Sequence, residues 1–123
     1  IKQKKRKLKT NMSNFNDTLQ SLMELDGAVA VALVDYSSGM SLGTAGGTND
    51  LNLDVAAAGN SEVIKSKMKV MGNLGLKDDI EDILISLGKQ YHLIRLLKKH
   101  NNLFVYYVLN KANANLAMAR HKL

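Results

Sequence analysis

The stretch GAVAVALVDYSSGMSLG, residues 27–43, decides the fold. Between Ala28 and Tyr36 only Asp35 is polar, so a strand formed here would be apolar on both faces. This pattern predicts a central β-strand that is covered on both sides. The turn sequence Ser37-Ser38-Gly39 follows, and the residues after it predict a return along a shorter edge strand.

Side chains of a strand alternate between its two faces, so the sequence predicts which residues share a face. One face of the predicted strand carries Val29, Val31 and Leu33, and the other carries Ala30, Ala32, Val34 and Tyr36. We expect the Asp35 carboxylate to accept backbone N–H groups of the turn, which is a common role of aspartate at such positions.

The rest of the chain predicts three helices, three more strands and a loop. The first helix is predicted to end near Leu25, the second to span about Asn52 to Asn73, and the third to span about Ala112 to Lys122. The predicted strands are Ile80–Leu87, Tyr91–Leu97 and Leu103–Leu109, and the predicted loop is Gly43–Asp50. The first helix is expected to be capped by Ser13 or Asn14, and the second by Asn49, Asp50 or Asn52. One domain, 12–123, would follow, of α/β (α+β) class with the order α-β-β-α-β-β-β-α.

The long second helix carries more apolar surface than one sheet can cover. Leu53, Ala57, Ile64, Met68 and Met71 line one side, and Ala56, Val63, Val70 and Leu74 widen it. Together these positions span roughly 160°, whereas about 100° is enough to cover a sheet. The small residues at 56–61 would allow another backbone to approach closely, so we favour contact with a second subunit over ordinary sheet packing.

The strand at 80–87 is predicted to be a sheet edge, because it starts with acidic residues and one of its faces is half polar. Ile83, Ile85 and Leu87 are expected to point inward, and Asp82, Leu84 and Ser86 outward. The strand at Leu103–Leu109 is apolar or aromatic throughout and is expected to be central.

The formal net charge of +6 belongs to the first residues of the chain. Residues 1–10 hold six of the 17 Lys and Arg, while all 11 Asp and Glu lie after them, so the remainder is formally neutral. The basic extension 1–11 could attract nucleic acid or an anionic membrane surface, could be a leader, or could extend the first helix.

No catalytic or metal-binding pattern stands out in the sequence. There is no cysteine, and the three histidines are scattered along the chain without ligand spacing. The glycines of the loop at 43–50 resemble a phosphate-binding loop only loosely, so a small-ligand sensor using Gly46 stays a minor alternative. We therefore expect no enzyme, no cofactor and no metal, and we expect a cytoplasmic protein because no apolar run approaches the roughly 18 residues of a membrane span.

The order of these elements resembles the roadblock/dynein light chain domain family. The matching pieces are LMELDGAVAVALVDYSSGMSLG, LDVAAAGNSEVI, IEDILISLGKQYHLIRLL and LFVYYVLNKANANLAMAR, within residues 14–123. The resemblance implies a profilin-like fold, a five-stranded antiparallel sheet with helices on both faces. It also implies a homodimer in which the 80–87 strands pair and the two long helices lie together. Members of this family act without catalysis, some as regulators or scaffolds of Ras-like small GTPases and others as light chains of motor complexes.

These observations give a set of candidate interaction residues. The dimer interface is predicted at Ala56, Ala57, Asn60, Val63, Ile64, Lys67, Ile83, Leu84 and Ile85, and partner binding at Glu62, Lys65 and Lys69. The favoured hypothesis is a homodimeric regulator or scaffold of a Ras-like small GTPase. The alternatives are a nucleic-acid or anionic-surface binding module that uses residues 1–11, and an adaptor of the motor-complex light-chain type.

Overall fold

The computed structural model describes residues 15–100 and 102–123, which form one five-stranded antiparallel sheet with helices on both faces. A helical segment at 15–22 is followed by β1 Ala28–Asp35, β2 Met40–Gly46, α2 Leu53–Asn73, β3 Asp82–Ser86, β4 Gln90–Leu96, β5 Leu103–Asn110 and α3 Leu116–Lys122. The strand order is β2-β1-β5-β4-β3. The predicted fold class, element order and central position of β1 and β5 are therefore confirmed. The predictions for residues 1–11, and the caps Ser13 and Asn14, lie outside the described residues.

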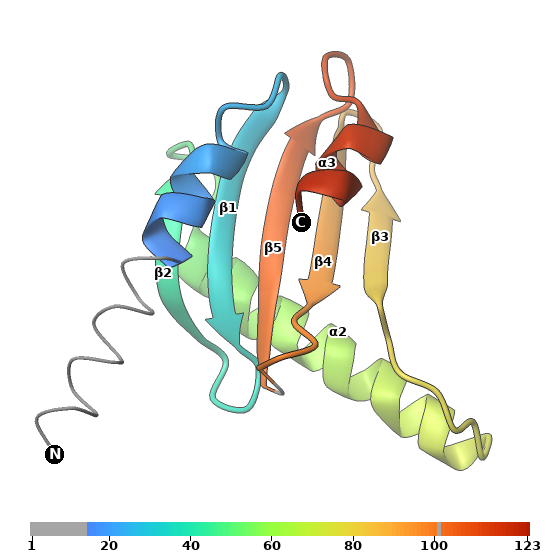
Figure 1. Ribbon diagram of the computed structural model, residues 1–123. Helices are drawn as coiled ribbons and strands as arrows, with labels where there is room; N and C mark the ends of the chain where they lie inside the picture. The colour runs from blue at the N-terminus through green and yellow to red at the C-terminus, as the bar shows by residue number, and fades with distance from the viewer. Residues whose placement is uncertain (1–14, 101) are drawn as a thin grey trace, which may run out of the picture.

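Each face of the sheet has its own hydrophobic core. On one face the helical segment 15–22 and α3 pack over β1, β5 and β4, with Leu19, Leu22, Val31, Leu93, Tyr107 and Ala119 buried. On the other face α2 packs on Ala30, Ala32, Val34, Ile94, Phe104, Tyr106 and Val108 through Ala57 and Ile64. Figure 1 shows the two short helices in front of the sheet and α2 crossing diagonally behind it.

The two apolar faces of β1 are confirmed, with one exception. Val31 and Leu33 lie in one core while Ala30, Ala32 and Val34 lie in the other. Val29 was expected beside Val31 but packs on the α2 side. The reason is an irregularity between Ala28 and Ala30 in the pairing with β5, which shifts the alternation by one residue.

The predicted ends of three elements are wrong. The first helix ends at residue 22 rather than Leu25, and residues 23–27 form turns. Strand β2 runs through Gly46, so the first half of the predicted loop is paired with β1. The start of α3 is Leu116 rather than Ala112, because the Asn115 side chain accepts the N–H of Met118 and caps the helix there. The predicted cap Asn52 of α2 is confirmed, since its side chain accepts the N–H groups of Asp54 and Val55.

Edge strand β3 is covered on both of its faces rather than on one. Ile83 packs against the core under α2, as expected, but Leu84 packs against the core on the opposite face instead of pointing to solvent. Leu87 was expected to point inward but is 43% exposed, because β3 ends at Ser86 and Leu87 begins the turn to β4. The sequence analysis predicted that only one face of β3 is buried, whereas side chains on both of its faces pack against a core.

Candidate interaction surface

Helix α2 presents three different sides, which follow from about 100° of rotation per residue. The side that faces the sheet contains Ala57, Ser61 and Ile64, all buried. Ala57 and Ile64 were predicted at a dimer interface, but both are fully buried by their own chain. Ala57 and Ile64 therefore lie in the core of the single chain, and the interface at the other positions stays a prediction.

Ser61 is a buried position that sequence reasoning missed. Its hydroxyl donates a hydrogen bond of 2.7 Å to the carbonyl oxygen of Ala57, one turn earlier in the helix. A serine can therefore face the sheet without leaving a polar atom unpaired. The signal in the sequence was its spacing of four from Ala57 and three from Ile64, which places it on the same side as both.

A second side of α2 is apolar and largely uncovered. We call it the α2 stripe; its members are Ala56, Asn60, Val63, Lys67, Val70 and Leu74, each three or four residues from the next. Val63 is 40% exposed, Val70 46% and Leu74 66%. Apolar side chains spaced in this way and left exposed by their own chain are a candidate for contact with another molecule.

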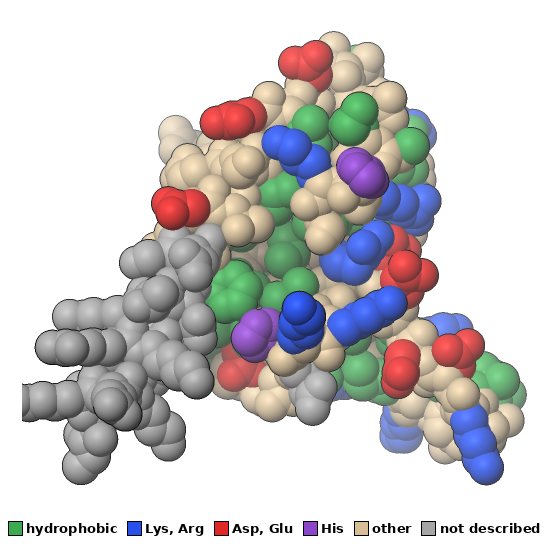
Figure 2. Space-filling model, in the orientation of Figure 1, with side chains coloured by type: hydrophobic (Ala, Val, Ile, Leu, Met, Phe, Trp, Pro, Cys, Tyr) green, Lys and Arg blue, Asp and Glu red, His purple; other side chains and the backbone are tan. Residues whose placement is uncertain are grey.

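The C-terminal half of α2 extends past the edge of the sheet. In Figure 1 it continues beyond β3 at the lower right. From Lys65 to Asn73 only Met71 is even half-buried, and Leu74 and Leu76 beyond the helix are exposed. Figure 2 shows apolar side chains on this projecting end. This half of α2 therefore lacks the cover that the sheet gives to the first half.

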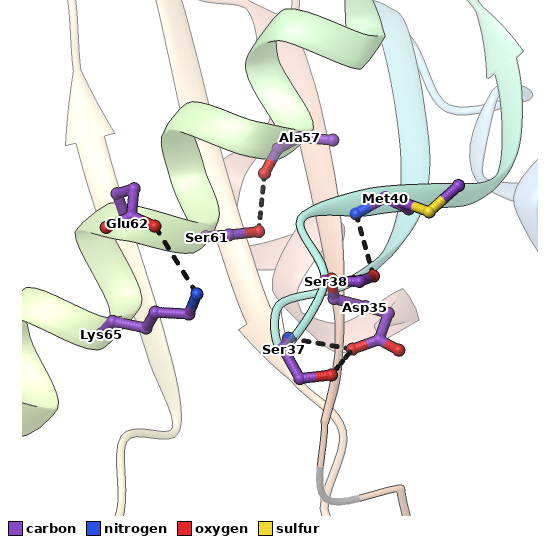
Figure 3. A network of polar contacts seen from close by, with 8 residues as sticks. All are labelled: Asp35, Ser37, Ser38, Met40, Ala57, Ser61, Glu62 and Lys65. Carbon is purple, nitrogen blue, oxygen red and sulfur yellow. Dashed lines mark hydrogen bonds and ion pairs between the residues drawn. The ribbon is translucent and has the colours of Figure 1, made fainter.

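The third side of α2 is polar and lies next to the β1–β2 hairpin (Figure 3). Here Lys65 Nζ lies 3.5 Å from Glu62 Oε1, and Lys69 is exposed one turn further along. The tip of the hairpin approaches the same side, since a Cβ built on Gly39 would lie 3.6 Å from Ala58 Cα. The three predicted partner-binding residues are thus brought together on one exposed side, beside a loop from another element.

The hairpin itself is held by the Asp35 carboxylate, as expected. Asp35 Oδ1 accepts the Ser37 N–H at 2.9 Å and the Ser37 hydroxyl (Figure 3). The hydroxyl of Ser37 is the main cause that lowers the pKa of Asp35. Burial comes next and acts in the opposite direction, and the backbone N–H groups of Ser37 and Ser38 lower the pKa further. The loop beside α2 is therefore shaped by its own side chains.

A row of hydrogen bonds runs from the α2 stripe across β5 to β4. The Asn60 side chain is bonded to the Tyr106 hydroxyl, which lies 2.8 Å from His92 Nδ1. His92 Nε2 lies 2.9 Å from Gln90 Oε1, and His92 pairs with Ile85 of β3 in the sheet. His92 is therefore a strand residue with hydrogen-bond partners on both ring nitrogens.

Burial favours the uncharged forms of His92 and Tyr106. It lowers the pKa of His92 and raises the pKa of Tyr106, so at neutral pH both rings stay uncharged. A neutral His92 that donates a hydrogen bond from Nε2 to Gln90 accepts a hydrogen bond from the Tyr106 hydroxyl at Nδ1. The row thus runs from the helix to β4, the neighbour of edge strand β3, without placing a charge between them.

The β3 edge contains the remaining predicted interface residues. Ile83, Leu84 and Ile85 are each half-buried, and β3 pairs only with β4 among the described strands. Its other edge therefore leaves backbone N–H and C=O groups without a strand neighbour in the described chain.

The described residues contain no group of three or more His, Asp or Glu side chains placed to hold a metal ion. None of the helices in residues 15–100 and 102–123 is long and apolar enough to cross a membrane.

No protein-family model matches the chain, and no curated protein matches it in sequence. Solved structures do match. Myxococcus xanthus MglB has a TM-score of 0.79 at 14% identity, covering 90% of this chain and 80% of that one. A Roadblock/LC7 domain from Streptomyces avermitilis has a TM-score of 0.75 at 12% identity, covering 87% and 86%. This chain has the roadblock fold. The gliding protein MglB of Thermus thermophilus shares it as well, with a TM-score of 0.71 at 14% identity over 86% and 77% of the two chains.

The roadblock resemblance inferred from the sequence is thus confirmed at the level of fold. At identities of 12–14% these matches show a shared backbone fold and do not assign roles to individual side chains. The α2 stripe and the polar side of α2 must therefore be interpreted from this chain's own side chains.

Proposed function

We propose that this protein is a homodimeric, non-catalytic regulator or scaffold of a Ras-like small GTPase. The observation that carries the proposal is the division of α2 into an uncovered apolar side and an exposed polar side. A helix with this division can contact a second copy through one side and a different protein through the other.

The dimer part of the proposal follows from the α2 stripe and the open edge of β3. Pairing of β3 with β3 of a second copy would extend the sheet across both subunits and give the backbone groups of the edge partners. The projecting half of α2 would then lie under the neighbouring subunit, which would cover Val63, Val70 and Leu74. Such a contact uses the same surface on both copies, as twofold symmetry requires.

The GTPase part of the proposal depends on the fold and on the polar side of α2. Two polar sides, one from each subunit, would form a platform that includes Glu62, Lys65, Lys69 and the hairpin at 35–40. Exposed cations of this kind steer an encounter with an acidic partner surface and fix its orientation. The family that the sequence resembles supplies the class of partner, a Ras-like small GTPase.

The experiment measures the binding of each Ras-like GTPase of the source organism, loaded with GDP or with a non-hydrolysable GTP analogue. Hydrolysis and nucleotide exchange are measured in parallel. We expect at least one GTPase to bind preferentially in one nucleotide state. Lys65→Glu combined with Lys69→Glu should weaken this binding by about tenfold or more, since each reversal replaces an attraction with a repulsion.

The matched control is Lys122→Glu, an identical charge reversal on α3, which packs on the opposite face of the sheet. It should leave binding unchanged. The proposal fails if no GTPase binds and neither hydrolysis nor exchange changes in any mixture.

A further inference from the structure

A groove of about 590 Å³ lies where the projecting half of α2 leaves the sheet. Its lining combines apolar side chains with charged ones, and its lip is formed by the segment that enters β3. The lining residues are Tyr36, Met68, Asp78, Asp79, Ile80, Glu81, Leu96, Leu97 and Lys98. Met68 lies roughly 140–160° around the helix from Val63 and Val70, so the groove opens on a different side from the α2 stripe.

The lip of the groove is acidic and lacks internal compensation. Asp78, Asp79 and Glu81 place three carboxylates within four residues, against the single cation Lys98 in the lining. None of the three forms an ion pair with another described residue. A groove that combines apolar side chains with such a lip fits an occupant that carries both apolar side chains and several positive charges.

The first nine residues of this chain have that composition. They contain Ile1 and Leu8 together with Lys2, Lys4, Lys5, Arg6, Lys7 and Lys9, and no acidic residue. The part of the chain after residue 10 has a formal net charge of zero, so these six cations have no matching excess of acid elsewhere in the sequence.

The path from this segment to the groove is short. Phe15, where the described chain begins, packs edge-on against His100, with ring centroids 5.4 Å apart. His100 belongs to the turn between β4 and β5, and Leu97 and Lys98 at the start of that turn line the groove. The five residues between Lys9 and Phe15 can span about 20 Å when extended. Residues 1–9 can therefore reach the groove around the end of the sheet.

We propose that residues 1–9 bind the acidic groove of their own chain. Their lysines and arginine would lie along Asp78, Asp79 and Glu81, and Ile1 or Leu8 would contact the apolar side chains of the lining. Binding of this kind would fill the space between the projecting half of α2 and the sheet. The proposal does not depend on the GTPase or on the dimer.

Zero-length carbodiimide cross-linking of the full chain tests the placement directly, because it joins a lysine amine to a carboxylate only where the two are in contact. We expect linkages from the lysines at 2–9 to Asp78, Asp79 or Glu81 at low salt, and their loss at about 1 M salt. A mixture of ¹⁴N and ¹⁵N chains should give linkages within single chains. Linkages that join differently labelled chains, or that reach only acids close in sequence such as Asp17 and Glu24, would overturn the proposal.

Trypsin provides a second measurement that does not need the carboxylates as reagents. In the full chain, Asp78→Asn, Asp79→Asn and Glu81→Gln together should speed cleavage within residues 2–9 by about tenfold, since about 1.4 kcal/mol of lost ion pairing gives that factor. The matched control neutralises three exposed acids away from the groove, as Asp50→Asn, Asp54→Asn and Glu62→Gln. Equal cleavage rates in the two triple variants would contradict the proposal.

Discussion

Gly46 and Gly75 share a backbone conformation but not an environment. Their φ angles are +69° and +68°, in the region that favours glycine. A Cβ on Gly46 would lie 2.7 Å from the carbonyl oxygen of Val29 and would overlap the end of the Met23 side chain, whereas a Cβ on Gly75 would meet nothing within 4 Å. Gly46 is therefore required both for its φ angle and for the close approach of β2 to the turn after residue 22.

Alanine at Gly46 and at Gly75 distinguishes the cost of a positive φ angle from the cost of a close contact. Gly75→Ala should cost about 1–2 kcal/mol in the free energy of unfolding, the strain of a positive φ alone. Gly46→Ala should cost about 1–3 kcal/mol more, because backbone at Val29 has to move. Urea denaturation of both variants measures the difference. Equal losses would mean that the contact around Gly46 can relax freely.

Between elements, one aspartate ties the edge of the sheet to the last helix. Asp82, at the start of β3, accepts a bond of 2.9 Å from Arg95 Nη2 on β4 and lies 3.3 Å from Arg120 Nε on α3. The side chains of Asp82 and Arg95 are only 18% and 19% exposed. The Nε atoms of Arg95 and Arg120 are buried and have no hydrogen-bond partner within the described part of the chain, so no acceptor there replaces the carboxylate if it is lost. A seven-residue helix is thereby held to a five-residue strand by more than apolar contact.

Removal of the Asp82 carboxylate should destabilise the protein far more than removal of an exposed carboxylate. Asp82→Asn should lower the free energy of unfolding by about 1–3 kcal/mol, because it removes the negative charge and one of the two acceptor oxygens from two partly buried guanidinium groups. Glu62→Gln breaks a pair whose side chains are 44% and 74% exposed, and it should cost less than about 0.5 kcal/mol. Thermal or urea unfolding of the two variants checks the contrast, and similar losses in both would count against the cluster as a tie between elements.

For the whole molecule, the decisive feature is that α2 is longer than the sheet it crosses. Its first half packs on β1 and β2 and contributes to the core, while its second half projects with the α2 stripe open. Because the uncovered side chains form one stripe that continues from the packed half, they would be covered together by a single partner. A second copy of the chain would supply an identical stripe and an identical open β3 edge.

A charge placed in the α2 stripe should separate the subunits without unfolding them. Val63→Glu changes an exposed side chain, unlike Ala57→Glu, which would place a carboxylate in the core of the single chain. We expect it to weaken dimerisation by about tenfold or more, because the charge would lose its water in the interface. Sedimentation equilibrium measures the mass, which is 13.5 kDa for one subunit.

Met118→Glu on α3, also at an exposed apolar residue, should leave the mass unchanged. A wild-type protein that stays monomeric at high concentration would contradict the proposed dimer.

The sequence by itself determined the order of the elements, the central position of β1 and β5 and the edge position of β3. These follow from local periodicity: a strand that is apolar on both faces has to be covered twice, and a half-polar strand does not. The same reasoning gave the Asp35 turn and the Asn52 cap, whose hydrogen bonds reach only two or three residues along the chain. Element ends were predicted less well where a distant partner decides them, as with Gly46 of β2.

Only the tertiary structure decided which apolar residues remain open. The sequence placed Ala57 and Ile64 at an interface together with Val63, but the line along which α2 crosses the sheet buries the first two and leaves the third exposed. That line also brings Met68, Leu97 and the acids at 78–81 to one groove, although they lie far apart in the chain. Helical spacing fixes which residues share a side, whereas the position of the helix on the sheet fixes which side is covered.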